Sequence, residues 1–336
     1  MCIRDRDFDL HELGISKNSN GPMIQPKPEE AHEHGAWAEI GNKYERDQDF
    51  VHAVEAFKKC TELAPGEKYY WDSLANNYKR LDKFEESRAA FLEGLSLYPN
   101  DLYTMAAIAY CDEQLAKDHE SLMFYLSSIA LKPDFPESWK GVASTLHRVG
   151  LDKYLGKAEK LRANSNEPYN LALANQINEE FLASHDEKDP LYWGHYINRG
   201  YLALKALKVS EAESVFRDIL GRCPADSLEV KRARSGLCLM FMTIGKNKEA
   251  LEMFDKAVAV TPKDPDIWYC RALIFDRQGD SKHALDFLGK ATALAPERIG
   301  WSQLFQTWLA QSKERETKLE RKEKGQAAGE KEKKTL

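Results

Sequence analysis

Apolar and polar residues alternate with the spacing of an α-helix along most of the chain, and the helical segments come in pairs. In residues 37–65, Trp37, Ile40 and Tyr44 are three or four residues apart, which places them on one face of a helix. After a polar corner, Phe57 lies on the apolar face of a second segment. Such a helix pair cannot bury its apolar face alone, so neighbouring pairs are predicted to pack against one another.

The helix pair returns with a period of about 34 residues. Trp37 and Trp71 are one period apart, and Pro65, Pro99 and Pro133 keep the same step. The step also separates Phe57 and Phe91, Ala250 and Ala284, and Pro262 and Pro296. A fixed period of this length indicates a tandem array of helix pairs.

The repeated unit carries a sequence signature, W-x2-L-G-x2-Y followed by A-x3-F and a closing Pro. In these residues the chain resembles the tetratricopeptide repeat family. The first unit is the most complete, with Trp37, Ile40, Gly41, Tyr44, Ala53, Phe57 and Pro65. The resemblance implies an all-α fold, a right-handed α-solenoid of about seven helix-turn-helix repeats with a C-terminal capping helix.

Signature residues are interpreted as core residues. Gly41 and Ala53 are small, so the two helices of a unit are expected to approach closely while Phe57 fills the remaining gap. The repeat units are predicted at 34–67, 68–101, 102–135, 136–169, 193–226, 231–264 and 265–298.

An irregular interval between repeats divides the array into two blocks. The interval from Pro133 to Pro224 is longer than two periods and shorter than three, so an extra segment lies between them. We therefore expect an N-terminal block of four units over 34–169, of which the fourth is degenerate, and a C-terminal block of three over 193–298. An irregular linker with one unpaired helix is expected between them, over 170–192.

Both ends differ from the repeats. Trp301, Leu304, Phe305 and Trp308 lie on one helical face of 299–311, which predicts a capping helix for the last repeat. A charged tail follows over 312–336. Residues 1–33 are predicted to be disordered or a non-native leader, because the opening MCIRDR resembles a leader that recurs in open reading frames assembled from environmental reads.

Composition narrows the function classes. The net charge of −6 argues against a general nucleic-acid binder, and no apolar run reaches the ~18 residues of a membrane span. The six cysteines are scattered without metal-ligand spacing, which favours a reducing compartment and a cytoplasmic location. If the native N-terminus is missing, a lost signal or anchor would make the protein periplasmic or membrane-anchored, and that alternative stays open.

Motifs for catalysis are absent from the sequence. It contains no phosphate-binding glycine loop, nucleophile elbow, zinc-protease motif or dinucleotide fingerprint. The scattered histidines are interpreted as surface or groove residues. The sequence therefore predicts a protein that is not an enzyme, with no cofactor and no metal.

The family resemblance also implies where a partner binds, namely at the second, fifth, ninth, twelfth and thirteenth positions of each unit, on a concave groove. In the N-terminal block we expect partner-binding residues at Asn42, Glu45, Arg46, Tyr69, Asp72, Asn76, Lys79, Arg80, Tyr103, Tyr110, Lys140, His147 and Arg148. Glu113, Gln114 and Ser144 occupy further positions of this kind. Asn amides and cations suit an extended peptide, and an ordinary hydrated groove is the alternative.

One subset of the family grips the C-terminal carboxylate of chaperones with a Lys, Asn, Asn, Lys, Arg set. Only Asn42 fits that set here, which argues against such a role. In the C-terminal block the groove positions are apolar, at Ile197, Tyr201, Leu204, Leu239, Met242, Tyr269 and Leu273. This groove suits an amphipathic helix, but self-filling by 170–192 or the capping helix, or self-association, is slightly preferred.

The favoured function is a non-enzymatic scaffold that binds peptide or helical segments of a partner protein. One alternative is an assembly or envelope-biogenesis factor whose N-terminal anchor or signal is missing. A less favoured alternative is an RNA-processing helical-repeat protein, and a regulatory array from a split enzyme is a further one. The sequence does not identify the partner.

Overall fold

The computed structural model describes residues 23–27, 32–163, 171–296 and 301–312. Within these ranges the chain is built of helices and contains no strand, so the all-α prediction is confirmed. The chain forms two compact units, Met1–Ala206 and Leu207–Leu336. The boundary between the two units falls inside the predicted fifth repeat, 193–226.

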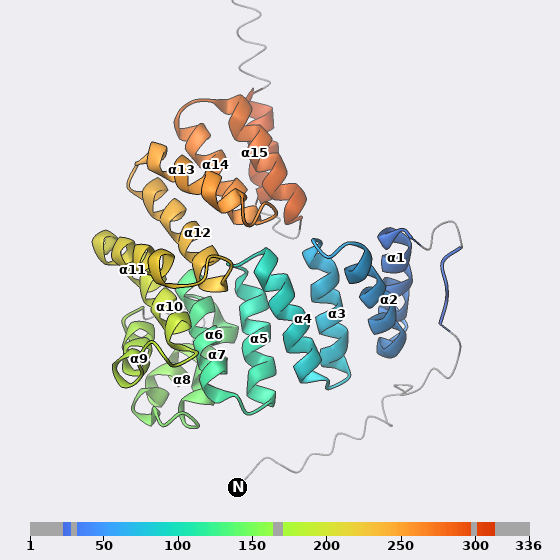
Figure 1. Cartoon of the computed structure of the whole chain (residues 1–336), viewed down its shortest axis with the longest axis horizontal. Coiled ribbons are helices and arrows are strands. Elements are labelled where there is room, and N and C mark those ends of the chain that lie inside the picture. Colours follow the sequence, from blue (N-terminus) through green and yellow to red (C-terminus); the bar gives the residue numbers. More distant parts are fainter. Residues whose placement is uncertain (1–22, 28–31, 164–170, 297–300, 313–336) are drawn as a thin grey trace, which may run out of the picture. The chain divides into compact units, whose positions relative to one another are not determined.

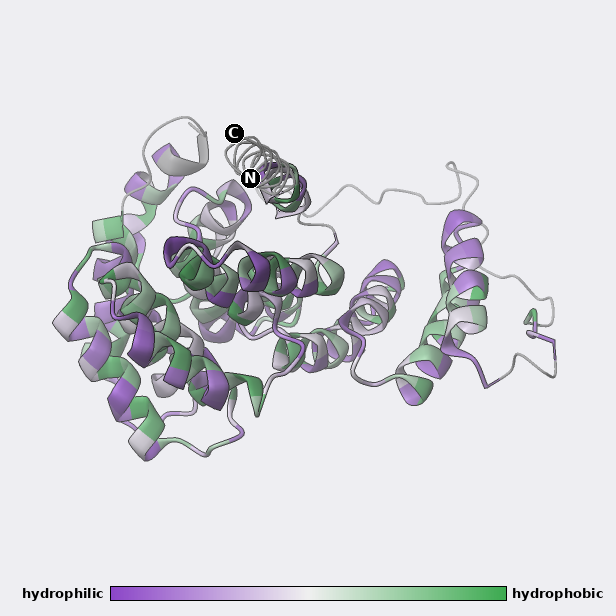
Figure 2. Ribbon diagram, turned by 90° about the horizontal axis from the view of Figure 1, so that it is seen from above, coloured by the Kyte–Doolittle hydropathy of each residue, from purple (hydrophilic) through white to green (hydrophobic). Residues whose placement is uncertain are grey.

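The first unit is a succession of helices, most of which pack in chain order (Figure 1). These are α1 (His34–Arg46), α2 (Phe50–Leu63), α3 (Lys68–Arg80), α4 (Phe84–Leu97), α5 (Leu102–Gln114), α6 (Asp118–Leu131), α7 (Pro136–Leu146), the 3-10 helix η1 (Asp152–Tyr154), α8 (Leu155–Ala163), α9 (Leu171–Ser184) and α10 (Tyr192–Lys205). Hydrophobic and hydrophilic residues alternate along the helices, as amphipathic helices require (Figure 2).

A left-handed residue makes the corner between the two helices of a pair. Gln48, Asp82 and Ala116 have positive φ angles of 59°, 56° and 56°, and Gly150 continues the series at 73°. The four positions follow one another at the repeat period, so each repeat turns at the same place. Glycine adopts this conformation without strain, whereas the other three residues adopt it at a cost of about 1–2 kcal/mol each.

The tryptophans and prolines of the signature are joined by hydrogen bonds between repeats. The indole Nε1 of Trp71 donates to the carbonyl of Pro65 at 2.7 Å, and Trp139 does the same to Pro133 at 2.9 Å. In the second unit Trp268 donates to Pro262 at 2.8 Å. Each tryptophan thus satisfies a carbonyl left over at the end of the preceding helix pair.

Close helix contacts explain the small signature residues. A Cβ atom added at the signature residue Gly41 would lie 2.8 Å from the ring of Phe57, and one at Gly141, outside the signature, would lie 2.0 Å from the ring of Tyr125. Ala53 and Phe57 are fully buried. The expectation that Gly41 and Ala53 make room for Phe57 is confirmed.

Helix α9 lies in the segment where the sequence predicted a single extra helix. It packs against α10 and α6, and α10 packs against α6 as well. Buried polar contacts join these helices: Asn178 Nδ2 donates to the carbonyl of His195 at 3.0 Å, and Ser127 Oγ donates to Asn198 Oδ1 at 2.8 Å. The added helix is therefore an integral part of the first unit.

The second unit contains α11 (Val209–Arg222), α12 (Leu228–Thr243), α13 (Asn247–Val258), α14 (Pro265–Arg277), α15 (Ser281–Leu294) and a terminal helix over 301–312. One face of the terminal helix packs against the buried cluster of Ala272, Phe287 and Leu288, through Trp301, Leu304, Phe305 and Trp308. These are the four residues expected to form the apolar face of the capping helix.

The terminal helix also covers part of the apolar groove predicted in the C-terminal block. The ring of Trp301 stacks on that of Tyr269, with 4.5 Å between ring centroids and 9° between planes. In the first unit, the groove residues Ile197 and Tyr201 are buried. None of the helices in the described ranges combines the length and apolar composition needed to cross a bilayer.

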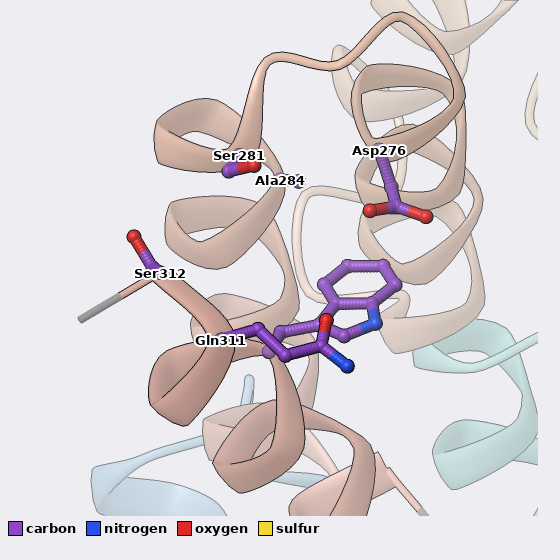
Figure 3. Close-up of a pocket in the computed structure, with 6 residues that line it drawn as sticks. Asp276, Ser281, Ala284, Gln311 and Ser312 are labelled. Atoms are coloured by element: carbon purple, nitrogen blue, oxygen red, sulfur yellow. The ribbon is translucent and has the colours of Figure 1, made fainter. Parts of the chain in front are cut away.

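A small pocket lies between the end of α14, the start of α15 and the terminal helix (Figure 3). Asp276, Ser281 and Gln311 are among the residues that line it. Its cavity volume is about 10 Å³, which is room for about one water molecule. The pocket is therefore too small to be a ligand site.

Candidate functional site

The predicted partner-binding residues all lie in the first unit, on the first helix of each pair or at its end. These helices are α1, α3, α5 and α7. Arg46, Asn76, Arg80, Lys140 and His147 are exposed, whereas Asn42, Glu45, Asp72 and Lys79 are partly buried. We call the surface formed by the predicted residues on these four helices the first-helix face.

Exposed aromatic side chains mark the first-helix face. Tyr69, Tyr103 and Tyr110 have 53%, 65% and 42% of their surface exposed. In the described part of the chain, these three are the aromatic residues among the exposed large hydrophobic side chains, and all three are predicted binding residues. Tyrosine is enriched among the residues that contribute most of the binding energy in protein interfaces, so three exposed tyrosines favour this face as a binding surface.

Neighbouring side chains hold the three tyrosines in place. The hydroxyl of Tyr69 donates to Asn42 Oδ1 at 2.7 Å, which joins α3 to α1. The ring of Tyr103 meets Phe135 edge-on at 5.3 Å between centroids, and the ring of Tyr110 meets Phe84 in the same way at 6.2 Å. The rings are therefore positioned before any partner arrives.

The acidic residues of the face are used within the protein. Glu45 Oε1 accepts a hydrogen bond from Asn77 Nδ2 at 2.6 Å, across α1 and α3. Asp72 pairs with the buried Lys68, whose ammonium also lies 2.6 Å from Asp101. Burial lowers the pKa of Lys68, but the two carboxylates outweigh burial and hold its pKa above the ordinary value. Lys68 therefore stays charged in its buried position.

Glu113 is the centre of a second group of contacts. It accepts hydrogen bonds from Ser144 Oγ at 2.7 Å and Tyr125 Oη at 3.2 Å, and it lies 3.1 Å from Arg148. Arg148 also pairs with Asp118 at 2.5 Å. Burial disfavours the charge of Arg148, yet the hydrogen bonds to Asp118 and Glu113 raise its pKa overall. These contacts fix α7 against α5 and α6.

Four cations of the face remain available. Among the described residues, Arg46, Arg80 and Lys140 form no ion pair, and Lys79 lies over the ring of Phe91 at 5.7 Å. Burial lowers the pKa of Lys79, and the adjacent Arg80 adds to that effect. His147 differs, because its Nδ1 lies 2.6 Å from Asp152 Oδ1.

The structure thus separates the predicted residues into two groups. Asn42 and Tyr69 are brought together, and Glu45, Asp72 and Arg148 are bound by neighbours, whereas the four cations and Asn76 make no hydrogen bond or ion pair with another side chain of the described ranges. Lys68 and Asn77, which contact Asp72 and Glu45, and Tyr125, which donates to Glu113, were not predicted. Their sequence positions were the one indication: Lys68 lies four residues before Asp72 on α3, and Asn77 and Tyr125 lie on helices that follow those of Glu45 and Glu113.

Other chemistry is not assembled in the described ranges. No three His, Cys, Asp or Glu side chains there gather closely enough to hold a metal ion. The described cysteines Cys60, Cys111, Cys223, Cys238 and Cys270 form no disulfide. Burial raises the pKa of Cys60 to about 12, which leaves its thiol protonated and unreactive at neutral pH.

Comparison with known proteins gives matches in each unit. A family model described as "TPR repeat" matches residues 239–279, and one described as "Tetratricopeptide repeat" matches residues 69–101. A search of curated proteins found none that matches this chain.

Solved structures with low sequence identity are also similar. A tetratricopeptide repeat protein from Parabacteroides merdae is 15% identical over 82% of this chain and 98% of its own, with a TM-score of 0.41. The thermophilic TPR protein TTC0263 from Thermus thermophilus is 16% identical over 62% of this chain and 100% of its own, with a TM-score of 0.38.

The repeats of the chain and the two matched stretches indicate the same repeat type. The repeat period places the corner residue in the same way in four successive pairs, and the Trp–Pro hydrogen bond recurs after two periods. The matched stretches fall on α3 and α4 in the first unit and on α12 to α14 in the second. The chain therefore contains tetratricopeptide repeats, matched over residues 69–101 in the first unit and 239–279 in the second.

Proposed function

We propose that the chain is a non-enzymatic scaffold that binds an extended segment of a partner protein along the first-helix face. The observation that carries the proposal is the exposure of Tyr69, Tyr103 and Tyr110 on this face. Exposing apolar ring surface to water is unfavourable, and contact with a partner removes that cost.

Polar groups beside the tyrosines suit the backbone of an extended segment. Asn76 donates from Nδ2 to the carbonyl of Asp72 at 2.9 Å, which orients its amide and leaves Oδ1 to accept a backbone N–H. Lys79, Arg80 and Lys140 supply charge for carboxylates of the partner.

The face is rigid because its helices are cross-linked by side chains. The contacts of Asn42 with Tyr69, of Glu45 with Asn77 and of Glu113 with Arg148 join successive first helices. A surface that is ordered in advance loses less conformational entropy on binding. We therefore assign these contacts a positioning role and assign the tyrosines, Asn76 and the cations to direct contact.

Affinity capture with the full chain, followed by mass spectrometry, tests the proposal. The first variant replaces Asn76, Lys79 and Arg80 together by Ala, and the control replaces the exposed Lys157 and Lys160 of α8 by Ala. Proteins captured by the wild type should be lost from the first variant and retained by the control. Thermal unfolding should show that both variants keep the fold. Equal capture by wild type and first variant would contradict binding at this face.

A further inference from the structure

Residues 23–27 lie against α1 rather than apart from the repeats. The backbone N–H of Ile24 donates to the hydroxyl of Tyr44 at 2.6 Å. Gln25, Pro26 and Lys27 line a surface depression together with residues of α1. Figure 1 shows this segment next to α1 at the blue end of the chain. We call residues 23–27 the strap.

The strap lies beside the outer face of α1, and the two line the same depression. In later repeats the corresponding face is covered by a helix, since α3 packs against α2 and α5 against α4. The positions on α1 are Ala36, Ile40 and Lys43, and the positions one period later on α3 are Tyr70, Leu74 and Asn77. The three residues of α3 are buried. In α1, Ala36 and Ile40 are partly buried and Lys43 is exposed, so the strap gives this face a thinner cover than a helix would.

We infer that the outer face of α1 is a docking surface for a short extended segment, and that the chain's own residues 23–27 are its occupant, held as a releasable cap. Tyr44 is well suited to this role because its ring is buried and stacks on His52 at 5.0 Å, which fixes the hydroxyl. Pro26 favours an extended backbone and has no N–H that needs a partner.

Most side chains of the strap are exposed, which limits the contacts that hold it. Ile24 is 39% exposed, and Gln25 and Lys27 are exposed as well, although Lys27 makes a further contact. A neutral hydrogen bond such as that from Ile24 to Tyr44 typically changes such an equilibrium by about threefold to tenfold. Asn42 and Arg46 line the same depression as Pro26 and Lys27, so release changes the surroundings of the first repeat's predicted binding residues. The inference does not depend on the proposed function.

Amide hydrogen exchange of the full chain and three variants tests the cap. The variants are Tyr44→Phe, a deletion of residues 1–27, and a deletion of residues 1–22 that keeps the strap. In the full chain we expect exchange of the Ile24 amide to be slowed about threefold to tenfold relative to an unstructured peptide. Tyr44→Phe should abolish this protection, because it removes the acceptor and keeps the stacked ring.

The two deletions separate the strap from the residues before it. Deleting residues 1–27 should speed exchange in α1 by about threefold to tenfold and leave α7 unchanged, whereas deleting residues 1–22 should alter neither helix. An unprotected Ile24 amide in the full chain would overturn the inference. So would equal acceleration in α1 and α7, or unchanged exchange in α1 after loss of the strap.

Discussion

At the scale of single residues, the contact of α9 with α10 contains a histidine that has no access to water. His195 is fully buried, its Nδ1 lies 2.9 Å from Asn178 Oδ1, and its ring stacks on Phe181 at 3.9 Å between centroids. Burial lowers its pKa to about 3, and the neighbouring His119 and His185 act in the same direction. The folded protein therefore keeps this imidazole neutral under conditions in which the unfolded chain protonates it.

This difference predicts acid sensitivity. The unfolded pKa is about 6.5, so below that pH the unfolded state binds a proton that the folded state does not. The stability contributed by neutral His195 is present above pH ~6.5 and falls by about 1.4 kcal/mol for each pH unit below it. Urea unfolding at pH 7, 6 and 5 should show this loss in the wild type.

A variant at the same position checks the origin of the loss. In His195→Phe the pH dependence between pH 7 and 5 should be smaller, even though the variant is less stable because Asn178 loses a partner. The control His147→Gln, at an exposed position, should follow the wild type. A His195→Phe variant with the pH dependence of the wild type would assign the effect to other groups.

At the scale of helices and their joints, the Trp–Pro hydrogen bond recurs at three contacts between repeats. It occurs in a buried and an exposed setting within one unit, because Trp139 is buried and its bond is enclosed, whereas the bond of Trp71 is exposed to water. Water can replace the indole at Pro65, but it cannot easily reach Pro133. The same contact should therefore carry different weight at the two joints.

Replacing each tryptophan by Phe measures this difference. Trp139→Phe should destabilise the protein by about 2–4 kcal/mol, because it leaves a buried carbonyl unsatisfied and creates a cavity. Trp71→Phe should cost only about 0.5–1.5 kcal/mol. Chemical denaturation of both variants gives the comparison, and equal costs would show that burial of the bond does not matter.

The sequence predicted those features that depend on local spacing. The helix pairs, the packing of Gly41 against Phe57 and the apolar face of the terminal helix all follow from residues a few positions apart or one period apart. The corner residues were harder to predict, because glycine at position 150 indicates a positive φ angle, whereas the residue types of Gln48, Asp82 and Ala116 do not. Likewise, Glu45 and Glu113 occupy predicted binding positions, but their contacts depend on side-chain conformations on neighbouring helices.

At the scale of the whole molecule, each helix pair depends mainly on its neighbours. In a repeat array the free energy of unfolding is approximately the sum of the stabilities of the single repeats and of the contact energies between adjacent repeats. In the second unit the terminal helix packs against the last helix pair, through the cluster of Ala272, Phe287 and Leu288. Its removal is therefore expected to act locally.

Deleting residues 297–336 tests this locality. Loss of Trp301, Leu304, Phe305 and Trp308 exposes apolar surface on α14 and α15, so amide exchange there should accelerate at least about tenfold. Exchange in α3 and α5 of the first unit should stay as in the full chain. Comparable acceleration in both units would show that the chain unfolds as one cooperative body.

The indole-to-carbonyl bond between repeats also constrains how such a chain can change length. In each of the three bonds the tryptophan follows the proline by six residues, across the boundary between two repeats. Excision of residues 102–135, one whole period, would place Trp139 six residues after Pro99 and so recreate the joint with a new neighbour. Excision near that boundary of a length that is not a whole number of periods would leave the indole without its carbonyl, so the molecule can be shortened or lengthened by whole repeats.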